Sequence, residues 1–293
     1  MKMYLYKLFR KLGYKISNES KRKKGLQAEI KKLGIRKDYN NLVYRSFNFF
    51  SLIKEEYPNI ILREYKNGVY AEFDDLKFYV ESPEEFYILK EVFVEKDYNF
   101  LSNGSCVVFD IGMNIGISSL FFALKDNITK IYSFEPVVAT FNQALYNFDL
   151  NKKYSNKIES FNFGLGGSTR AEKVLYDSQM KGNCGIRLDL SPSITIDKAQ
   201  EIEIQIISIE KIIKDIIDRH PHQKIVLKID CEGAEYEILK KLEKEDLLIK
   251  IDVFMIEWHD KGSEILEEIL IKSDFNIVSR ALSPITGMIY AFK

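Results

Sequence analysis

Short apolar runs alternate with amphipathic stretches from residue 106 to the end of the chain. Runs that are apolar on both faces are typical of strands in a parallel sheet with helices on both sides. Strands are expected at CVVFDI (106–111), KIYSF (130–134), IDVFMIE (251–257) and near 158–163, 202–207 and 225–230. Helices are expected between them, at 115–125, 138–150, 208–218, from about 234, and at 262–272. This alternation predicts a doubly wound α/β sheet.

The last two apolar runs, FNIVSRAL and GMIYAFK, are separated only by the residues between Ser283 and Thr286. A parallel crossover needs about a dozen residues or more, so one of these two strands must run antiparallel to the rest. Binding sites in such sheets lie beyond the carboxyl ends of the strands, where the strand order reverses. The polar residues at those strand ends are therefore the candidates for function.

Residues 1–103 show a different pattern. Residues 39–57 are predicted to form a helix. The runs IILREY and VYAEF flank the turn Asn67-Gly68, which predicts a hairpin. The run LKFYV could extend this hairpin to three antiparallel strands. The segment SPEE (82–85) has the cap, proline and glutamate of a helix start. We divide the chain into an N-terminal extension of helices and small antiparallel strands (1–103) and a main α/β domain (104–293).

The formal net charge of zero hides an asymmetry. Residues 1–37 hold 13 Lys and Arg against 2 acidic residues, whereas the rest of the chain holds 30 against 41. A short basic amphipathic helix is expected near the start, with one apolar stripe formed by Leu5, Leu8, Phe9 and Leu12. Two interpretations stay open: peripheral contact with an anionic membrane surface or acidic partner, and packing against the acidic body or a solvated arm.

Composition limits the remaining classes of protein. With 46% hydrophobic and 29% charged residues, no apolar run of membrane length and no secretory signal, we expect a packed cytoplasmic protein that is at most membrane-peripheral. Three scattered cysteines form no disulfide framework and no CxxC pair. Nucleic acid is not expected as a partner, because the core carries no stripe of basic and aromatic residues. No feature indicates an oligomeric state.

A glycine-containing turn follows the strand at 106–111. Gly112 and Gly116 let a ligand approach the backbone where the strand passes into a helix, whose N-terminus offers free amides. Glu135 ends the next strand, where a carboxylate can accept hydrogen bonds from two ribose hydroxyls. The turn and Glu135 predict an adenosine-type nucleoside site. We assign cofactor binding to residues at these strand ends: Asp110, Gly112, Asn114, Gly116, Glu135 and Asn162.

Asp110 bears on which nucleoside would bind. Dinucleotide sites use G-x-G-x-x-G around a pyrophosphate, whereas this turn is G-x-x-x-G with Asp110 two residues before its first glycine. A carboxylate there would repel a pyrophosphate but would complement the ammonium and sulfonium groups of S-adenosylmethionine. Methyl transfer therefore ranks above hydride transfer by an NAD-dependent dehydrogenase, which stays an alternative.

Three blocks of sequence resemble the FkbM family of S-adenosylmethionine-dependent methyltransferases: VVFDIGMNIGISSL (107–120), FEP (134–136) and LKIDCEGAEYEIL (227–239). The resemblance spans about residues 104–260, with Met113 where the family has a small residue. It implies a seven-stranded, Rossmann-like class I methyltransferase sheet with a reversed last strand. It also implies S-adenosylmethionine as cofactor and O-methylation of a hydroxyl on a glycan, polyketide or other secondary metabolite.

Carboxylates cluster after the strand at 225–230. Asp230 and Glu232 lie beside Gly233, next to the expected cofactor, and we assign both to catalysis. Glu235, one turn into the next helix, is interpreted as a partner of the helix dipole. Lys228, inside an apolar strand, is interpreted either as the buried partner of a carboxylate or as a functional group.

His259 is the third catalytic candidate. It follows the strand at 251–257, where the family resemblance points to the E-x-H pattern that begins at Glu257. A neutral imidazole near its ordinary pKa of about 6.5 can take a proton from an alcohol. The alternative of equal weight is a histidine that caps the strand end beside Trp258. In a less favoured interpretation, a magnesium ion is bound by four residues: Asp230, Glu232, Glu257 and His259. We therefore expect no metal.

Residues 168–200 are expected to admit the acceptor, because they form a long irregular connection with several glycines and polar residues. The alternative is a disordered insertion. A last alternative function is a non-catalytic, membrane-associated binding protein that keeps the sheet and binds no nucleoside.

Overall fold

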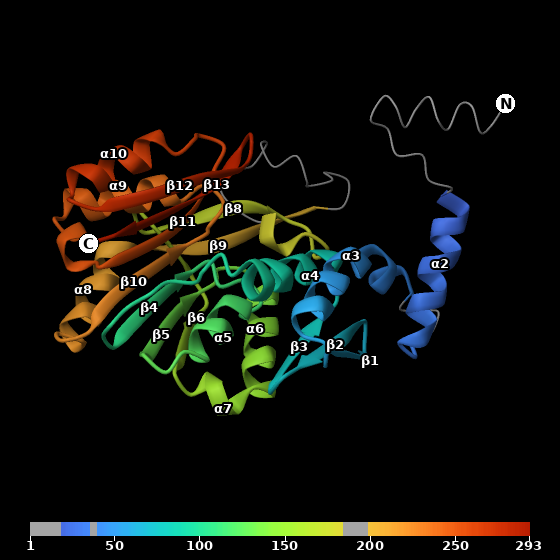
Figure 1. Cartoon of the computed structure of the whole chain (residues 1–293). Coiled ribbons are helices and arrows are strands. Elements are labelled where there is room, and N and C mark those ends of the chain that lie inside the picture. The colour runs from blue at the N-terminus through green and yellow to red at the C-terminus, as the bar shows by residue number, and fades with distance from the viewer. Residues whose placement is uncertain (1–18, 36–39, 184–198) are drawn as a thin grey trace, which may run out of the picture.

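The structure is a computed structural model that describes residues 19–35, 40–183 and 199–293. The amphipathic helix expected around Leu5 to Leu12 lies outside the described residues. The first described helix is α2 (Glu19–Lys32), which follows that segment (Figure 1). No helix within the described ranges is long and apolar enough to cross a membrane.

A seven-stranded sheet forms the centre of the main domain (Figure 1). Its strands, in spatial order, are β12 (Asn276–Ser283), β13 (Thr286–Phe292), β11 (Val253–His259), β10 (Lys224–Ile229), β4 (Cys106–Ile111), β5 (Ile128–Phe134) and β6 (Ile158–Phe161). Strands β11, β10, β4, β5 and β6 pair in parallel, whereas β13 pairs antiparallel with both of its neighbours. The predicted class I arrangement with a reversed last strand is confirmed.

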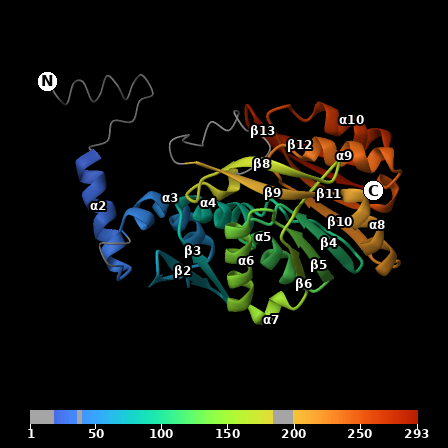
Figure 2. The same cartoon turned by 180° about the vertical axis from the view of Figure 1, so that it is seen from behind.

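Two hydrophobic clusters cover the two faces of this sheet. Along β4, Val107 and Phe109 pack into one cluster and Cys106 and Val108 into the other, as the two-residue period of a strand requires. Figure 2 shows the helices in two layers. One layer holds α8 (Ile209–Arg219), α9 (Glu235–Lys244) and α10 (Glu264–Lys272), and the other holds α5 (Ile117–Ala123), α6 (Val138–Leu150) and α7 (Lys152–Ser155). Both faces are therefore buried.

The N-terminal elements share the hydrophobic cluster of α5 and α6. They are α3 (Asn40–Glu56), the antiparallel strands β1 (Ile61–Tyr65), β2 (Gly68–Phe73) and β3 (Leu76–Val80), α4 (Pro83–Lys90) and the π-helix η2 (Glu91–Glu95). Ser82 caps α4 in the predicted capping box, with its hydroxyl accepting from the Glu85 amide. The extension is thus packed against the main sheet, and the predicted three-stranded meander is confirmed. The boundary at residue 103 stays a prediction.

A third sheet corrects part of the expected connection at 168–200. Its order is β7 (Gly164–Gly166), β9 (Gln200–Ser208) and β8 (Arg170–Tyr176), so the strand expected near 202–207 lies outside the central sheet. The sequence of β8 is highly charged and for that reason was expected to be irregular. In the structure, Lys173 of β8 forms an ion pair with Glu201 of β9 at 2.7 Å. Such pairs stabilise a strand whose own sequence is polar. Residues 184–198 lie outside the described residues.

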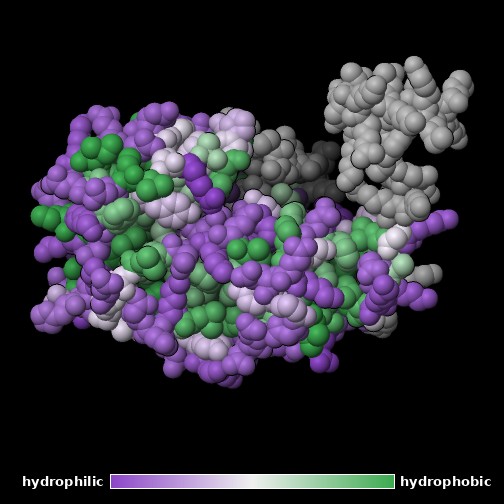
Figure 3. Space-filling view, viewed as in Figure 1, coloured by the Kyte–Doolittle hydropathy of each residue, from purple (hydrophilic) through white to green (hydrophobic). Residues whose placement is uncertain are grey.

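The surface seen in Figure 3 is mainly hydrophilic, with smaller apolar groups between. A few large apolar residues are strongly exposed, among them Leu101 (94%) and Ile249 (76%). Scattered exposed apolar residues are normal on folded proteins. The arrangement that matters for function lies instead at the carboxyl ends of the parallel strands.

Candidate functional site

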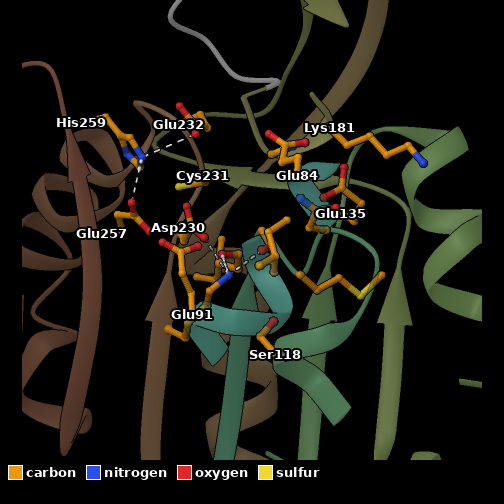
Figure 4. A pocket seen from close by; sticks show the side chains of 18 of the residues that line it. Glu84, Glu91, Ser118, Glu135, Lys181, Asp230, Cys231, Glu232, Glu257 and His259 are labelled. Atoms are coloured by element: carbon orange, nitrogen blue, oxygen red, sulfur yellow. Dashed lines mark hydrogen bonds and ion pairs between the residues drawn. The ribbon is translucent and has the colours of Figure 1, made fainter. Parts of the chain in front are cut away.

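A cavity of about 480 Å³ lies at the carboxyl ends of β4, β5, β10 and β11. The predicted residues that line it come from four strand ends: Gly112, Asn114, Glu135, Asp230, Glu232 and His259. Figure 4 shows the carboxylates and His259 around this space. The cavity lies at the edge of the sheet where ligands bind in doubly wound folds, beside the point at which the strand order reverses between β4 and β10.

The two glycines of the turn after β4, Gly112 and Gly116, have different structural roles. Gly112 has φ of +78°, and a Cβ there would lie 1.8 Å from the carbonyl oxygen of Asp230, so only glycine fits between the neighbouring strand ends. Gly116 also has a positive φ, but a Cβ there would meet the ring of Phe148. It allows the close packing of α5 on α6 and does not line the cavity. The assignment of Gly116 to cofactor contact is not supported by this placement.

Asp110 lies behind the cavity wall rather than on it. Its carboxylate is fully buried and accepts hydrogen bonds from Ser118 (2.7 Å) and Ser119 (2.5 Å), and it pairs with Lys228 at 3.2 Å. The cavity lining does not include it. The expected direct attraction between Asp110 and a cationic cofactor is therefore corrected, because a buried ammonium already neutralises this carboxylate.

Lys228 joins the two central strand ends. Its ammonium donates to the carbonyl oxygen of Gly112 at 2.5 Å and lies 3.5 Å from Asp230 Oδ2, in addition to its contact with Asp110. Burial lowers the pKa of Lys228, but the charges of Asp110 and Asp230 outweigh that effect and leave the pKa raised. Lys228 is thus a permanent cation that fixes the glycine turn and also lines the cavity.

Glu135 lies on the cavity wall as predicted. It is 7% exposed, and its Oε1 accepts the Val137 amide at 2.8 Å, which points the carboxyl group across the strand end. Burial raises the pKa of Glu135 to about 7. Asn162 is exposed and does not line the cavity. It donates instead to the carbonyl oxygens of Glu135 (2.9 Å) and Pro136 (3.2 Å), so it braces the loop that carries Glu135.

The three predicted catalytic residues meet on the other side of the cavity. His259 Nε2 lies 3.6 Å from Glu232 Oε1 and 3.8 Å from Glu257 Oε1 (Figure 4). Asp230 accepts a hydrogen bond from the hydroxyl of Tyr98 at 2.9 Å. An imidazole surrounded by carboxylates, open to a cavity, can hold or pass a proton.

Glu235 fixes the orientation of His259. It is fully buried, and its Oε1 accepts both the backbone amide (2.9 Å) and the imidazole Nδ1 (3.2 Å) of His259. The expected helix-dipole role misses this contact, because Glu235 begins α9 whereas His259 ends the neighbouring strand β11. Burial lowers the pKa of His259, but Glu235, Glu232 and Glu257 more than compensate and raise it to about 10. The ring is therefore protonated at neutral pH, unlike the neutral base expected from its ordinary pKa.

Asp230, Glu232 and His259 also have the spacing of metal ligands. One potential ligand atom from each lies within 4.8 Å of the others. Two carboxylates with an imidazole form a donor set that divalent cations accept. In that case Glu235 would hold the histidine ring from behind, as outer carboxylates do at metal sites. The residues thus fit a divalent cation as well as a proton relay.

The N-terminal extension supplies a wall of the cavity that sequence reasoning missed. Glu84, Tyr87, Ile88 and Glu91 follow one another at helical spacing and face the cavity from α4 and the start of η2. The opposite side of this helix, with Phe86 and Leu89, is buried in the core. In the sequence, this helix has a partly polar face beside an apolar one. The sequence does not tell which part of the protein the polar face contacts.

Lys181 links that wall to the segment that follows β8 of the third sheet. It is 5% exposed and donates to Glu81 (2.6 Å), Glu85 (2.9 Å) and the side chain of Gln143. The next residue, Gly182, donates its amide to Glu84 at 3.1 Å. The short helix η3 (Lys181–Asn183), at the end of the segment after β8, is therefore held against α4 and α6.

Comparison with known proteins identifies relatives. The Methyltransferase FkbM domain matches residues 110–276, more than half of the 293-residue chain. Methyltransferase sdnD of Sordaria araneosa is 26% identical over 213 residues, which cover 65% of this chain and 82% of that protein. Methyltransferase 1 of Beauveria bassiana is 28% identical over 175 residues, which cover 54% of this chain and 68% of that protein.

Among solved structures, a methyltransferase FkbM from Methylobacillus flagellatus aligns with a TM-score of 0.44 and 20% identity. The alignment covers 71% of this chain and 50% of that one, so the chain spans half the length of that structure. The family match runs from the end of β4 to beyond His259 and includes residues on both sides of the cavity. On this ground the chain belongs to the FkbM methyltransferase family.

Proposed function

We propose that the protein is an S-adenosylmethionine-dependent O-methyltransferase that modifies a hydroxyl of a glycan, sugar or secondary metabolite. The observation that carries the proposal is that Glu135 and the group formed by Asp230, Glu232 and His259 line one cavity. A cofactor bound at Glu135 and an acceptor bound beside Asp230, Glu232 and His259 would therefore share one cavity. Membership of a methyltransferase family supports the same reaction.

The residues present fit this cofactor. Glu135 offers a carboxylate at the end of the second strand, which suits the two ribose hydroxyls of a nucleoside. Gly112 brings bare backbone to the cavity, and acidic side chains there complement a cation. Glu135, Gly112 and Asn114 would hold the cofactor. When bound, S-adenosylmethionine supplies an electrophilic methyl group on a positively charged sulfur.

The chain's own residues then position the acceptor hydroxyl and receive its proton. Because His259 is already protonated at neutral pH, it is a cation rather than a base, and its Nε2 lies 3.6 Å from Glu232. The carboxylates of Asp230 and Glu232 are the proton acceptors at this end of the cavity. Orientation of the reactants can supply roughly 7 to 11 kcal/mol. A positioned base adds about 3 to 5 kcal/mol, so alignment by the cavity walls dominates.

Calorimetric titration with S-adenosylhomocysteine and with NAD tests the proposal directly. Binding of S-adenosylhomocysteine and not NAD is expected. Transfer of a labelled methyl group from S-adenosylmethionine to a panel of hydroxylated compounds, followed by mass spectrometry, then tests the reaction. Binding of NAD alone would favour the dehydrogenase, and binding of neither would favour a non-catalytic protein. Repeating the transfer with EDTA separates the metal-free reaction from one that uses Asp230, Glu232 and His259 as metal ligands.

A further inference from the structure

We propose that the acceptor carries a protonated amine close to the hydroxyl that is methylated. The inference rests on the proposed function and names the chemical class of its acceptor. Its basis is the charge of the cavity wall away from Glu135, where Glu91 from η2 and Glu257 from β11 face the same space.

The wall of the cavity has more acidic than basic groups. Among the described residues, six carboxylates line it, Glu84, Glu91, Glu135, Asp230, Glu232 and Glu257, against the basic groups of Lys181, Lys228 and His259. Acidic side chains from η2, from the turn after β10 and from β11 thus face one cavity, and a bound cation would favour their ionised forms.

The nearby cations are held by other partners. Lys181 pairs with Glu81 and Glu85, Lys90 pairs with Glu95 at 2.7 Å, and Arg280 pairs with Asp97. Within the described ranges, no lysine or arginine forms an ion pair with Glu91 or Glu257, and the latter has only His259 at 3.8 Å. The side-chain hydrogen bond of Glu91 is to the neutral Tyr87, so a cationic group of the acceptor would add a charged partner for Glu91 and a second one for Glu257.

Aromatic rings complete the wall on this side. Tyr87 and Tyr98 line the cavity with Glu91 and Glu257. The ammonium of Lys228 already lies 5.1 Å from the centre of the Tyr98 ring, so this wall stabilises a cation in the folded protein. Carboxylates combined with aromatic faces suit an alkylammonium group better than a neutral hydroxyl, and they disfavour acceptors that carry phosphate or carboxylate.

Part of this wall lies outside the family match. Glu91 and Tyr87 lie before residue 110, where the family match begins, whereas Glu257 lies within the match. The charge of the wall is therefore set by residues on both sides of that boundary.

The test uses the full-length protein saturated with S-adenosylhomocysteine and two matched pairs of probes. Ethanolamine is compared with ethylene glycol, and glucosamine with N-acetylglucosamine, by calorimetry in the presence of EDTA. We expect the amine of at least one pair to bind tenfold or more tightly than its neutral partner. Glu91→Gln and Glu257→Gln should each reduce that preference severalfold. Glu56→Gln, which lies outside the cavity lining and pairs with Lys96 at 2.9 Å, should leave it unchanged.

Equal or absent binding of amine and neutral probe in both pairs would overturn the inference. So would a preference that survives both glutamine variants. A parallel titration with MgCl₂ covers the competing cation: binding of Mg²⁺ without any amine preference would assign these carboxylates to a metal instead. S-adenosylhomocysteine is titrated first, so a failure of cofactor binding, which would count against the proposed function, is distinguished from a failure of the amine preference alone.

Discussion

Glu235 accepts two hydrogen bonds from His259, one from its backbone amide at 2.9 Å and one from its imidazole Nδ1 at 3.2 Å. The same carboxylate accepts the amide of Gly233 at 2.8 Å through its other oxygen. One buried side chain therefore holds both the turn after β10 and the end of β11. It fixes which ring nitrogen of His259 faces the cavity.

Glu235→Gln should lower turnover about tenfold, because the ring of His259 loses its charged partner. The affinity for S-adenosylhomocysteine should stay unchanged, since Glu235 does not line the cavity. Steady-state kinetics and calorimetry separate the two effects. Glu237→Gln is the matched control: it lies on the same helix and pairs with Arg170 at 2.9 Å. Equal losses of turnover and cofactor affinity would point to a general disturbance of the fold.

His259 should keep its proton well above neutral pH, since its pKa is raised to about 10. A raised pKa in the folded state adds stability that is complete below the unfolded value of about 6.5 and is lost as the pH rises towards 10. The difference in unfolding free energy between the wild type and His259→Gln should therefore shrink from pH 6 to pH 10 in urea titrations. Nitrogen NMR of the imidazole checks the protonation directly, and a midpoint near 6.5 would contradict it.

Glu135→Ala should weaken binding of S-adenosylhomocysteine by about 1.5 to 3 kcal/mol, the usual loss for hydrogen bonds to a charged group. Because burial raises the pKa of Glu135 to about 7, affinity in the wild type should also fall as the pH drops below 7. Calorimetry at several pH values measures both effects. Glu159→Ala on the neighbouring strand, whose partner is Lys130 at 2.9 Å, is the control. Unchanged affinity would remove Glu135 from the cofactor site.

Lys228→Met should destabilise the fold by about 3 to 5 kcal/mol, because it leaves the buried carboxylate of Asp110 without its cation. Adding Asp110→Asn should recover part of that loss. Lys130→Met removes an exposed pair with Glu159 and should cost at most about 1 kcal/mol. Urea denaturation measures all three. A similar effect of both lysine substitutions would show that the buried pair has no special weight.

Local sequence patterns predicted the order of strands and helices well. The strand from Cys106, the closing antiparallel pair and the capping box at Ser82 each depend on neighbouring residues, and each is confirmed. Gly112 and Glu135 both line the cavity, because strand ends of a parallel sheet meet at one edge, and their contact with a cofactor stays a prediction. These features need only short-range information and the general rules of α/β folds.

Partners that are distant in the sequence were not predictable in the same way. Asp110 looked like a cofactor ligand until its contact with Lys228, 118 residues later, placed it behind the wall. Glu235 looked like a helix-dipole residue until the fold brought His259 to it. The protonation of His259 depends on three carboxylates, those of Glu232, Glu235 and Glu257. Such effects arise only when tertiary packing removes water and brings charges together.

The residues that line the cavity come from two separate parts of the sequence. The strands that end at Gly112 and Glu135 lie inside the family match, whereas the helix face with Glu84, Tyr87 and Glu91 is encoded before it. A substitution on that face would therefore reshape one wall of the cavity without altering the turn at Gly112 or the strand end at Glu135. Under the proposed function, acceptor preference and cofactor affinity would then vary separately.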